Sequence, residues 1–132
     1  MKKWFVVLAV VIVACIGCGK VDHKKAETLV IALVQKEDSD KYNETSKYYS
    51  EEFNQGESVE ARAQKYRQLK EAYGDVVSMQ CISVKDSTDL DDRPIVQLIY
   101  RVKRTKVTTL EAFSVVSQNG DYKVEQDDIK QE

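Results

Sequence analysis

Residues 66–85 read YRQLKEAYGDVVSMQCISVK, and the spacing of the apolar residues changes at Gly74. Before this glycine, apolar residues recur every three or four positions, as they do on one face of a helix. After it, they alternate, as they do in a strand with one buried face. Gly74 itself stands where helices often end on a residue with positive φ. The sequence therefore predicts that helices give way to strands at this glycine.

Three helices are predicted before Gly74. Residues 24–37 carry a buried stripe with helical spacing. A second helix is expected to begin at the N-cap signal Asp38-Ser39-Asp40 and to run to about residue 53, where Asn54-Gln55-Gly56 ends it. The third helix is expected over 59–73, with Ser58 as its cap. The apolar stripe of the first helix comprises Ala26, Leu29, Val30, Leu33 and Val34.

Four strands are predicted after Gly74. Their expected ranges are 76–85, 95–104, 107–117 and 121–128. The connections are an acidic loop from Asp86 to Arg93, a tight reversal at Thr105-Lys106 and a two-residue hairpin at Asn119-Gly120. In the first strand, Val77, Met79 and Cys81 are expected to share one face, and Ile129 is expected in a frayed tail.

A run of helices followed by a run of strands predicts an α+β fold. The predicted domain covers residues 24–129, with three helices packed on a bent four-stranded antiparallel sheet. The second and third strands are each about ten residues long, or about 34 Å if extended. Strands of that length must twist and bend in a small domain, so we expect a half-open cone with the helices against its inner face.

The first residues look like an export signal. Met1-Lys2-Lys3 is cationic, and an uncharged, largely apolar run of thirteen residues follows from Trp4 to Ile16. This order is typical of a secretory signal peptide, which we place at 1–17. The run is shorter than the roughly 20 apolar residues that a membrane-spanning helix needs.

Two cysteines near the end of this signal resemble the lipobox of bacterial lipoproteins. The lipobox has an aliphatic residue three positions before the cysteine and Gly or Ala immediately before it. Ile12-Val13-Ala14-Cys15 fits this pattern at every position. Cys15-Ile16-Gly17-Cys18 has the expected Gly immediately before the cysteine but an unusual Cys three positions before it. Cleavage is therefore expected before Cys15, with Cys18 as the alternative, and residues 18–25 are expected to be a polar tether. The resemblance implies acylation of the cysteine with chains such as palmitate, and two or more acyl chains anchor a protein stably. Ordinary secretion, with cleavage after Gly17 or Gly19, is the competing interpretation.

Composition excludes several classes of function. Residues 18–132 carry 18 Lys and Arg against 22 Asp and Glu, a balance that argues against a nucleic-acid partner. Cys81 is the only cysteine of the predicted domain, so neither a disulfide nor a zinc set is expected there, and we expect this thiol to be buried. The sequence contains no motif for a cofactor, a metal or nucleophilic catalysis, and we predict no catalytic residues, no metal and no cofactor.

Four features could still carry chemistry. Tyr100 is the candidate pocket residue, because its hydroxyl could donate to a ligand; the competing interpretation is a core tyrosine whose hydroxyl reaches the rim. His23 is expected to be a solvated tether residue without an orienting partner. Four acidic residues could hold calcium but are expected to form a solvated connection between strands: Asp86, Asp89, Asp91 and Asp92. Four basic residues are expected to form a solvent-exposed face: Arg101, Lys103, Arg104 and Lys106.

The order of the predicted elements resembles the nuclear-transport-factor-2-like (cystatin-like) cone fold, and more narrowly small bacterial lipoprotein domains of unknown function with that fold. The likeness covers roughly residues 24–129 and implies a concave pocket, although no matching catalytic pair is present. It is carried by Tyr48-Tyr49 to Phe53, Leu69 to Gly74, Val96 to Val102, Glu111 to Val115 and Gly120 to Val124.

These features predict an envelope lipoprotein, held on a membrane by its lipid and facing outside the cytoplasm. Its expected activity is non-catalytic binding of a small apolar ligand or an envelope protein. One alternative is a cofactor-independent isomerase or hydrolase of the cone fold, and another is a structural lipoprotein without a ligand. Two facing ionisable groups in a pocket would favour the enzyme, and a filled core would favour the structural protein.

Overall fold

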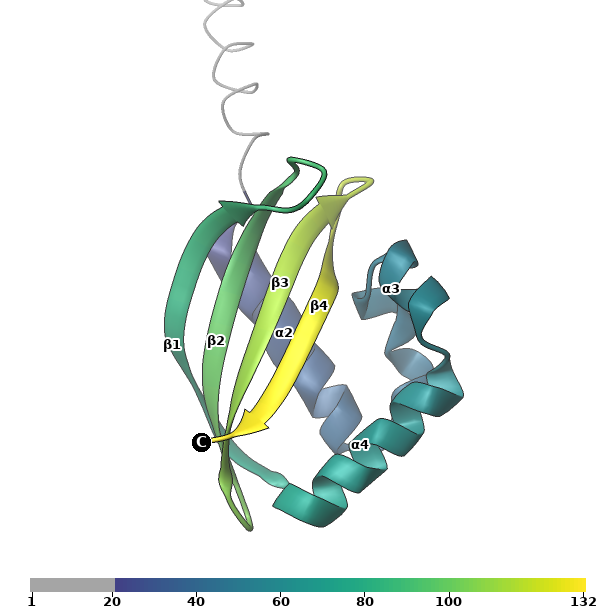
Figure 1. Cartoon of the computed structure of the whole chain (residues 1–132), viewed down its shortest axis with the longest axis vertical. Helices are drawn as coiled ribbons and strands as arrows, with labels where there is room; N and C mark the ends of the chain where they lie inside the picture. Colours follow the sequence, from purple (N-terminus) through teal and green to yellow (C-terminus); the bar gives the residue numbers. More distant parts are fainter. Residues whose placement is uncertain (1–20) are drawn as a thin grey trace, which may run out of the picture.

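The computed structural model describes residues 21–132 and confirms the α+β class (Figure 1). The helical part comes first, and an antiparallel sheet follows it in the order β1-β2-β3-β4. The helical elements are α2 (His23–Asp38), the 3₁₀ turns η1 (Tyr42–Glu44) and η2 (Ser46–Tyr48), α3 (Glu51–Gly56) and α4 (Val59–Tyr73). The strands are β1 (Val76–Thr88), β2 (Pro94–Arg104), β3 (Thr108–Gln118) and β4 (Asp121–Gln131).

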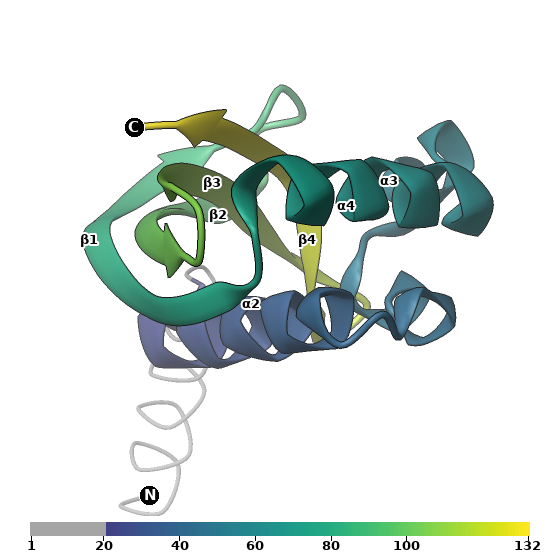
Figure 2. The same cartoon turned by 90° about the horizontal axis from the view of Figure 1, so that it is seen from below.

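The sheet is strongly curved, and the helices lie on its concave side (Figures 1 and 2). Helix α2 crosses this concave face, where Val30 and Leu33 pack against Val96, Leu98 and Val102 of β2. All five side chains are fully buried. Burial of this apolar stripe holds the helix on the sheet, since each such side chain contributes roughly 1.5–3 kcal/mol.

Helix α4 ends as predicted, at Gly74. Ser58 caps its start by accepting a hydrogen bond from the amide of Ala61 at 3.1 Å. Gly74 has φ 89° and ψ −179°, so its φ is positive although the residue is not in the left-handed helical region. A Cβ atom at this position would lie 1.9 Å from Oγ1 of Thr105. Both the backbone angle and the close approach of the β2–β3 turn require glycine here.

The predicted second helix over 40–53 is wrong. Asp40 has φ 61°, which ends the helical conformation after α2. The short turns η1 and η2 follow as separate elements. Tyr49 is extended and forms a parallel bridge with Val124 of β4. Ser50 then starts the six-residue helix α3, which includes Asn54-Gln55-Gly56. The tertiary contact between Tyr49 and β4 overrides the local helical pattern.

Two strands run further than predicted, and one residue of β1 faces the other way. β1 continues to Thr88, and β4 continues to Gln131, so Ile129 pairs with Glu111 instead of fraying. A register shift between Val76 and Ser78 turns Val77 outward, where it is 58% exposed. The predicted inward face of β1 is therefore wrong for Val77. The hairpin at Asn119-Gly120 is confirmed, with φ 54° and 84°, the pair of positive angles of a type I′ turn.

Helix α2 begins earlier than the predicted tether allows. His23, Lys24 and Lys25 form its first turn, and Asp22 caps it through the amide of Lys25. The predicted signal peptide and both candidate lipidation sites, Cys15 and Cys18, lie outside the described residues. No helix within residues 21–132 is long and apolar enough to cross a membrane.

Candidate binding groove

The concave side of the sheet is filled by side chains. A small cavity remains beside Glu37 and Tyr66, and its volume is about 10 Å³; Arg104 and Glu111 also line it. That space is about enough for one water molecule. This cavity therefore has no room for a ligand larger than water.

A cluster of acidic and phenolic groups occupies this end of the core. The hydroxyl oxygen of Tyr49 lies 3.0 Å from Oε2 of Glu37 and 2.8 Å from Oδ2 of Asp127. Tyr66 donates to the same oxygen of Asp127 at 3.1 Å. A hydroxyl has one proton to donate, so the two contacts of Tyr49 require a proton on one carboxyl group. The cluster joins α2, the segment before α3, α4 and β4.

Glu37 is the group that holds this proton. It is buried, and burial is the main cause that raises its pKa well above the ordinary value. The neighbouring Asp127 raises the pKa further, and Glu111 adds to the effect. Protonated Glu37 can donate to Tyr49, which then donates to Asp127. The proton chain satisfies every close contact in the cluster.

Arg62 fixes the segment that carries Tyr49. Its side chain is fully buried, and its guanidinium lies 4.2 Å from the centre of the Tyr49 ring. It also donates to Oγ1 of Thr45 at 3.0 Å and to Oδ1 of Asn54 at 2.9 Å, and it pairs with Glu57 at 3.2 Å. These contacts hold η1, η2 and α3 against α4.

Neither Glu37 nor Arg62 was predicted from the sequence to have a role. A signal for Glu37 was present, because it continues the apolar stripe of α2 three and four positions after Val34 and Leu33. An ionisable residue on a buried stripe needs a partner inside the core. Arg62 had no comparable signal, since its ring partner Tyr49 comes from the segment that was mispredicted.

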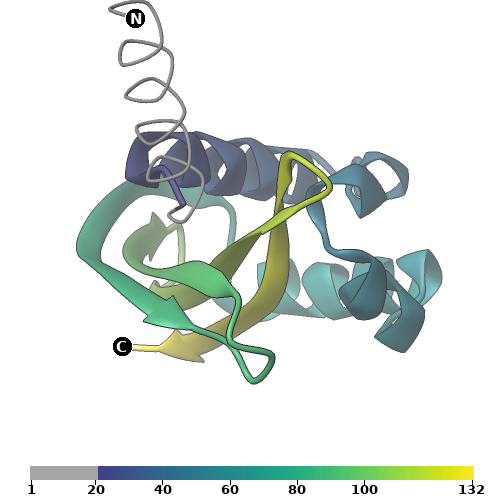
Figure 3. The same ribbon diagram turned by 90° about the horizontal axis from the view of Figure 1, so that it is seen from above.

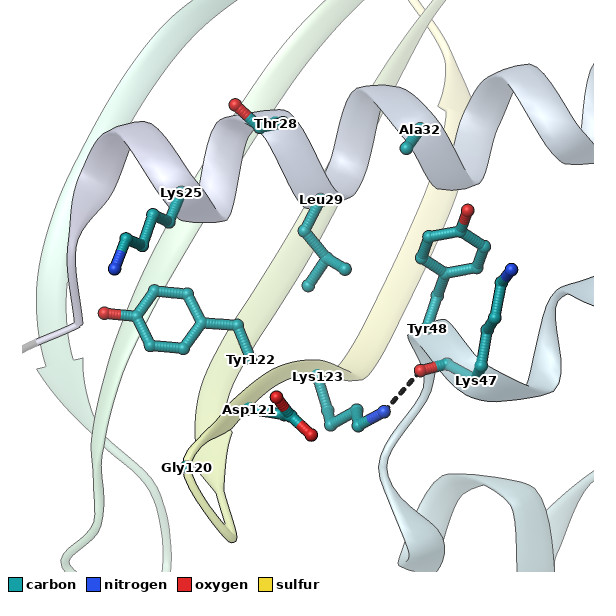
Figure 4. Close-up of a pocket in the computed structure, with 10 residues that line it drawn as sticks. All are labelled: Lys25, Thr28, Leu29, Ala32, Lys47, Tyr48, Gly120, Asp121, Tyr122 and Lys123. Carbon is teal, nitrogen blue, oxygen red and sulfur yellow. Dashed lines mark hydrogen bonds between the residues drawn. The ribbon is translucent and has the colours of Figure 1, made fainter.

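Two spaces large enough for a ligand lie outside the core of the described domain. One, of about 500 Å³, lies over β2, β3 and β4 and is lined by Ile99, Leu110, Ala112, Asp128, Ile129 and Lys130. The other lies between α2 and the start of β4 (Figure 4). We call it the α2–β4 groove, and its volume is about 630 Å³. Leu29 and Ala32 of α2 form one side, and Tyr48 and Tyr122 come from the facing segments. The remaining lining residues are Lys25, Thr28, Lys47, Gly120, Asp121 and Lys123.

Two contacts fix the walls of the groove. The hydroxyl of Tyr122 accepts a hydrogen bond from the amide of Asp22 at 2.6 Å, which ties β4 to the start of α2. The ammonium of Lys123 donates to the carbonyl oxygen of Lys47 (Figure 4). The ammonium of Lys47 lies 5.4 Å from the centre of the Tyr48 ring. The groove thus combines an apolar and aromatic lining with three lysines.

Tyr100, the candidate pocket residue, does not line this groove. It is only 2% exposed, and its hydroxyl has no hydrogen-bond partner within the described part of the chain. Burial is the main cause that raises its pKa. The ring packs edge-on against Phe113, with 6.1 Å between the centres. Its hydroxyl is covered and does not reach the rim of the domain.

Cys81 and His23 lie near the exposed edge of the sheet. Cys81 is half-buried, and burial together with Glu27 raises the pKa of its thiol, which keeps it protonated. His23 was expected to have no partner, and this is wrong, because its Nε2 lies 2.8 Å from Oδ1 of Asp86.

The acidic connection between β1 and β2 is organised by Asp89. Its Oδ1 accepts from the amides of Asp91 and Arg93 at 2.9 Å each, and its Oδ2 pairs with the Arg93 guanidinium at 2.8 Å. Hydrogen bonds from Arg93 and the backbone lower the pKa of Asp89. Among residues 21–132, no three His, Cys, Asp or Glu side chains are placed to share a metal ion.

The expected basic face on β2 is wrong for Arg104. This side chain is buried and pairs with Oε2 of Glu111 at 2.8 Å. It also donates to the carbonyl of Gly74 at 3.2 Å. The positive charges that remain exposed on this strand are Arg101 and Lys103.

No family model matches the chain, and no curated protein matches it.

Proposed function

We propose that this protein is a bacterial envelope lipoprotein with a cystatin-like cone domain, tethered through acylated Cys15 or Cys18, and that the domain is a non-catalytic binding module. The binding surface is the α2–β4 groove. The observation that carries the proposal is the volume of the groove, about 630 Å³, against about 500 Å³ for the space over β2, β3 and β4 and about 10 Å³ for the interior cavity. Ligand sites typically have volumes of roughly 300–1,000 Å³.

The enzyme alternative finds partial support in the pair formed by Glu37 and Asp127. A buried carboxyl group with a raised pKa, such as Glu37, close to a second carboxyl group is a common arrangement in acid–base catalysis. The adjoining cavity, however, is the size of one water molecule, so a substrate could not reach these carboxyls without opening the core. The pair is better explained as a structural contact that joins the helices to β4 through hydrogen bonds.

Mass spectrometry of the mature N-terminus tests the tether. We expect acylation at one cysteine in the wild-type protein, and its loss in either the Cys15→Ser or the Cys18→Ser variant but not in both. An unmodified N-terminus at Cys18 or Lys20 would show a secreted protein and contradict the proposed anchoring.

Hydrogen exchange tests the groove and does not require its ligand to be identified. The full protein would be compared in native membranes and after purification in detergent. We expect slower exchange in the membranes for the first turns of α2, for residues 45–49 and for residues 120–124. The edge strand β1, residues 76–88, serves as the internal control and should exchange equally in both samples. Equal exchange at the groove would favour the structural lipoprotein without a ligand.

A further inference from the structure

Three lysines of the α2–β4 groove lack an acidic partner. Of the other described lysines, Lys36, Lys65 and Lys70 each lie within 4.0 Å of a carboxylate, and the rest are exposed at other places on the domain surface. Within residues 21–132, no carboxylate lies that close to the ammonium groups of Lys25, Lys47 or Lys123. Unpaired ammonium groups gathered on one groove attract an anionic ligand.

The positive charge of the groove is local. Residues 21–132 hold 17 Lys and Arg against 22 Asp and Glu, and the groove lining holds three lysines against Asp121 alone. Near the start of α2, Asp86 is paired with His23, whereas the carboxylates of Asp22 and Glu27 are in no ion pair with a described residue and offset part of this positive charge. Lys24, which is exposed beside Lys25, adds a fourth positive charge.

The groove lies at the end of the domain nearest the proposed anchor. The start of α2 and the β3–β4 turn lie together at one end of the sheet, and the C-terminus lies at the other (Figures 1 and 3). Val21 follows Cys18 by three residues and Cys15 by six. An extended chain spans at most about 3.5 Å per residue, so Val21 lies within about 11 Å of acylated Cys18 or about 21 Å of acylated Cys15.

The lining residues suit the surface of a lipid bilayer. Lysine side chains lay their carbon chains along apolar surface and keep the ammonium group in water, and tyrosines favour the headgroup level of membranes. Each lysine close to an anionic leaflet contributes about fivefold to its partitioning. Leu29, Tyr48 and Tyr122 supply the apolar part of such a contact, and the lysines supply its charge.

We infer that the α2–β4 groove binds the phosphate headgroups of anionic phospholipids in the membrane that carries the tether. This inference rests on the proposed lipoprotein function and names the ligand of its groove. Such binding would hold the domain against the bilayer in one orientation, with the end of the sheet that carries the C-terminus turned away from the contact (Figure 1).

Lysine labelling on vesicles tests the inference. The full mature protein would be treated with acetic anhydride in the presence of excess phosphatidylcholine vesicles, either pure or mixed with phosphatidylglycerol. We expect labelling of Lys25, Lys47 and Lys123 to slow by about fivefold with phosphatidylglycerol. The protection should disappear in about 1 M salt, where the Debye length is about 3 Å. Equal labelling on both kinds of vesicle would overturn the inference.

Matched variants separate the groove from overall charge. The triple variant K25Q/K47Q/K123Q should lose roughly 100-fold in its preference for phosphatidylglycerol vesicles over phosphatidylcholine vesicles. The preference is measured by flotation after the acylated protein has distributed between the two kinds of vesicle in one mixture, since the acyl chains contribute equally to both. The control K85Q/K103Q/K130Q removes the same charge from the sheet and should retain wild-type partitioning. Equal losses in the two variants would indicate nonspecific attraction and overturn the inference.

Control reactions with soluble anions show whether the groove lysines are protected from acetylation by a membrane or by a soluble compound. Inorganic phosphate and polyglutamate, each without vesicles, should leave the three groove lysines as reactive as in buffer. Protection by either would assign the groove to a soluble phosphate compound or an acidic protein instead of the membrane. The same spectra report acylation at Cys15 or Cys18, so the loss of the tether and the loss of headgroup contact are read separately.

Discussion

The hydroxyl groups of two buried tyrosines, Tyr49 and Tyr100, contribute differently to the stability of the domain. The Tyr49 hydroxyl joins two carboxyl groups, whereas the buried Tyr100 hydroxyl has no hydrogen-bond partner in the described domain. Burying a hydroxyl without a partner costs roughly 1–3 kcal/mol. The two residues therefore respond in opposite ways when the hydroxyl is removed.

Removal of the Tyr100 hydroxyl should stabilise the protein. Tyr100→Phe keeps the ring against Phe113 and should raise the free energy of unfolding by about 1 kcal/mol. Tyr49→Phe, the matched change, should lower it by about 2 kcal/mol because it removes the group between Glu37 and Asp127. Urea denaturation of both variants measures these changes. A destabilised Tyr100→Phe variant would indicate that the hydroxyl has a water or ligand partner.

Two arginine–glutamate pairs on β2 differ mainly in burial. The Arg104 and Glu111 side chains are 4% and 2% exposed, and those of Arg101 and Glu132 are 45% and 39% exposed. Arg104→Ala should lower the free energy of unfolding by about 3–5 kcal/mol because it leaves a buried carboxylate without its cation. Arg101→Ala should change it by less than about 1 kcal/mol. Similar losses for both would show that burial does not set the strength of these pairs.

At the scale of elements, Gly74 joins the helical part to the sheet. Its positive φ turns the chain from α4 into β1, and Thr105 of the β2–β3 turn packs against its Cα. The amide of Thr105 also donates to the carbonyl of Asp75 at 2.9 Å. The helix end and the strand turn are thus built as one unit.

Gly74→Ala should be strongly destabilising. The added Cβ would meet Oγ1 of Thr105 at 1.9 Å. The combination of φ 89° and ψ −179° also costs a residue with a side chain about 1–3 kcal/mol. We expect a loss of about 2–4 kcal/mol, measured by thermal and urea unfolding. Gly56→Ala is the control, because a Cβ there meets nothing within 4 Å; it should leave stability unchanged or raise it by about 0.5 kcal/mol.

At the scale of the whole molecule, the cluster around Glu37 connects the helices to the last strand. Glu37 comes from α2, Tyr49 from the segment before α3, Tyr66 from α4 and Asp127 from β4. The other titratable or charged groups around Glu37 are Glu111 of β3, Arg104 of β2, Lys70 of α4 and Asp38 of α2. Since they come from elements far apart in sequence, the cluster forms only when the domain is assembled.

The raised pKa of Glu37 makes stability depend on pH. The unfolded chain releases this proton near the ordinary glutamate pKa, about 4.3, whereas the folded protein holds it to higher pH. Its stabilising contribution is therefore complete below about pH 4 and is lost as pH rises through the folded pKa. The loss is at most about 1.4 kcal/mol per pH unit.

Glu37→Gln should remove this dependence. The stability of the variant relative to wild type should rise between pH 5 and pH 8, because wild type loses the contribution of the proton and the variant does not. Urea midpoints across this range measure the difference, with the exposed Glu60→Gln variant as the control. A constant difference between Glu37→Gln and wild type would contradict a raised pKa.

By itself, the sequence determined the α+β class, helices α2 and α4, the four strands and the glycine-containing turns. Local spacing of apolar residues and the backbone freedom of glycine are sufficient for these features, because each depends on neighbours in the chain. The predicted export signal and lipidation at Cys15 or Cys18 also rest on local sequence alone.

Only the tertiary structure decided the path between α2 and α4, the burial of Glu37, Arg62 and Arg104, and the α2–β4 groove. Tyr49 leaves the helical pattern because it pairs with Val124 and meets carboxyl groups from α2 and β4. Lys25, Lys47 and Lys123 are separated by 22 and 76 positions in the chain, and folding brings them to one groove. Long-range contacts of this kind leave no periodic signal in the sequence, so they appear only when the elements pack together.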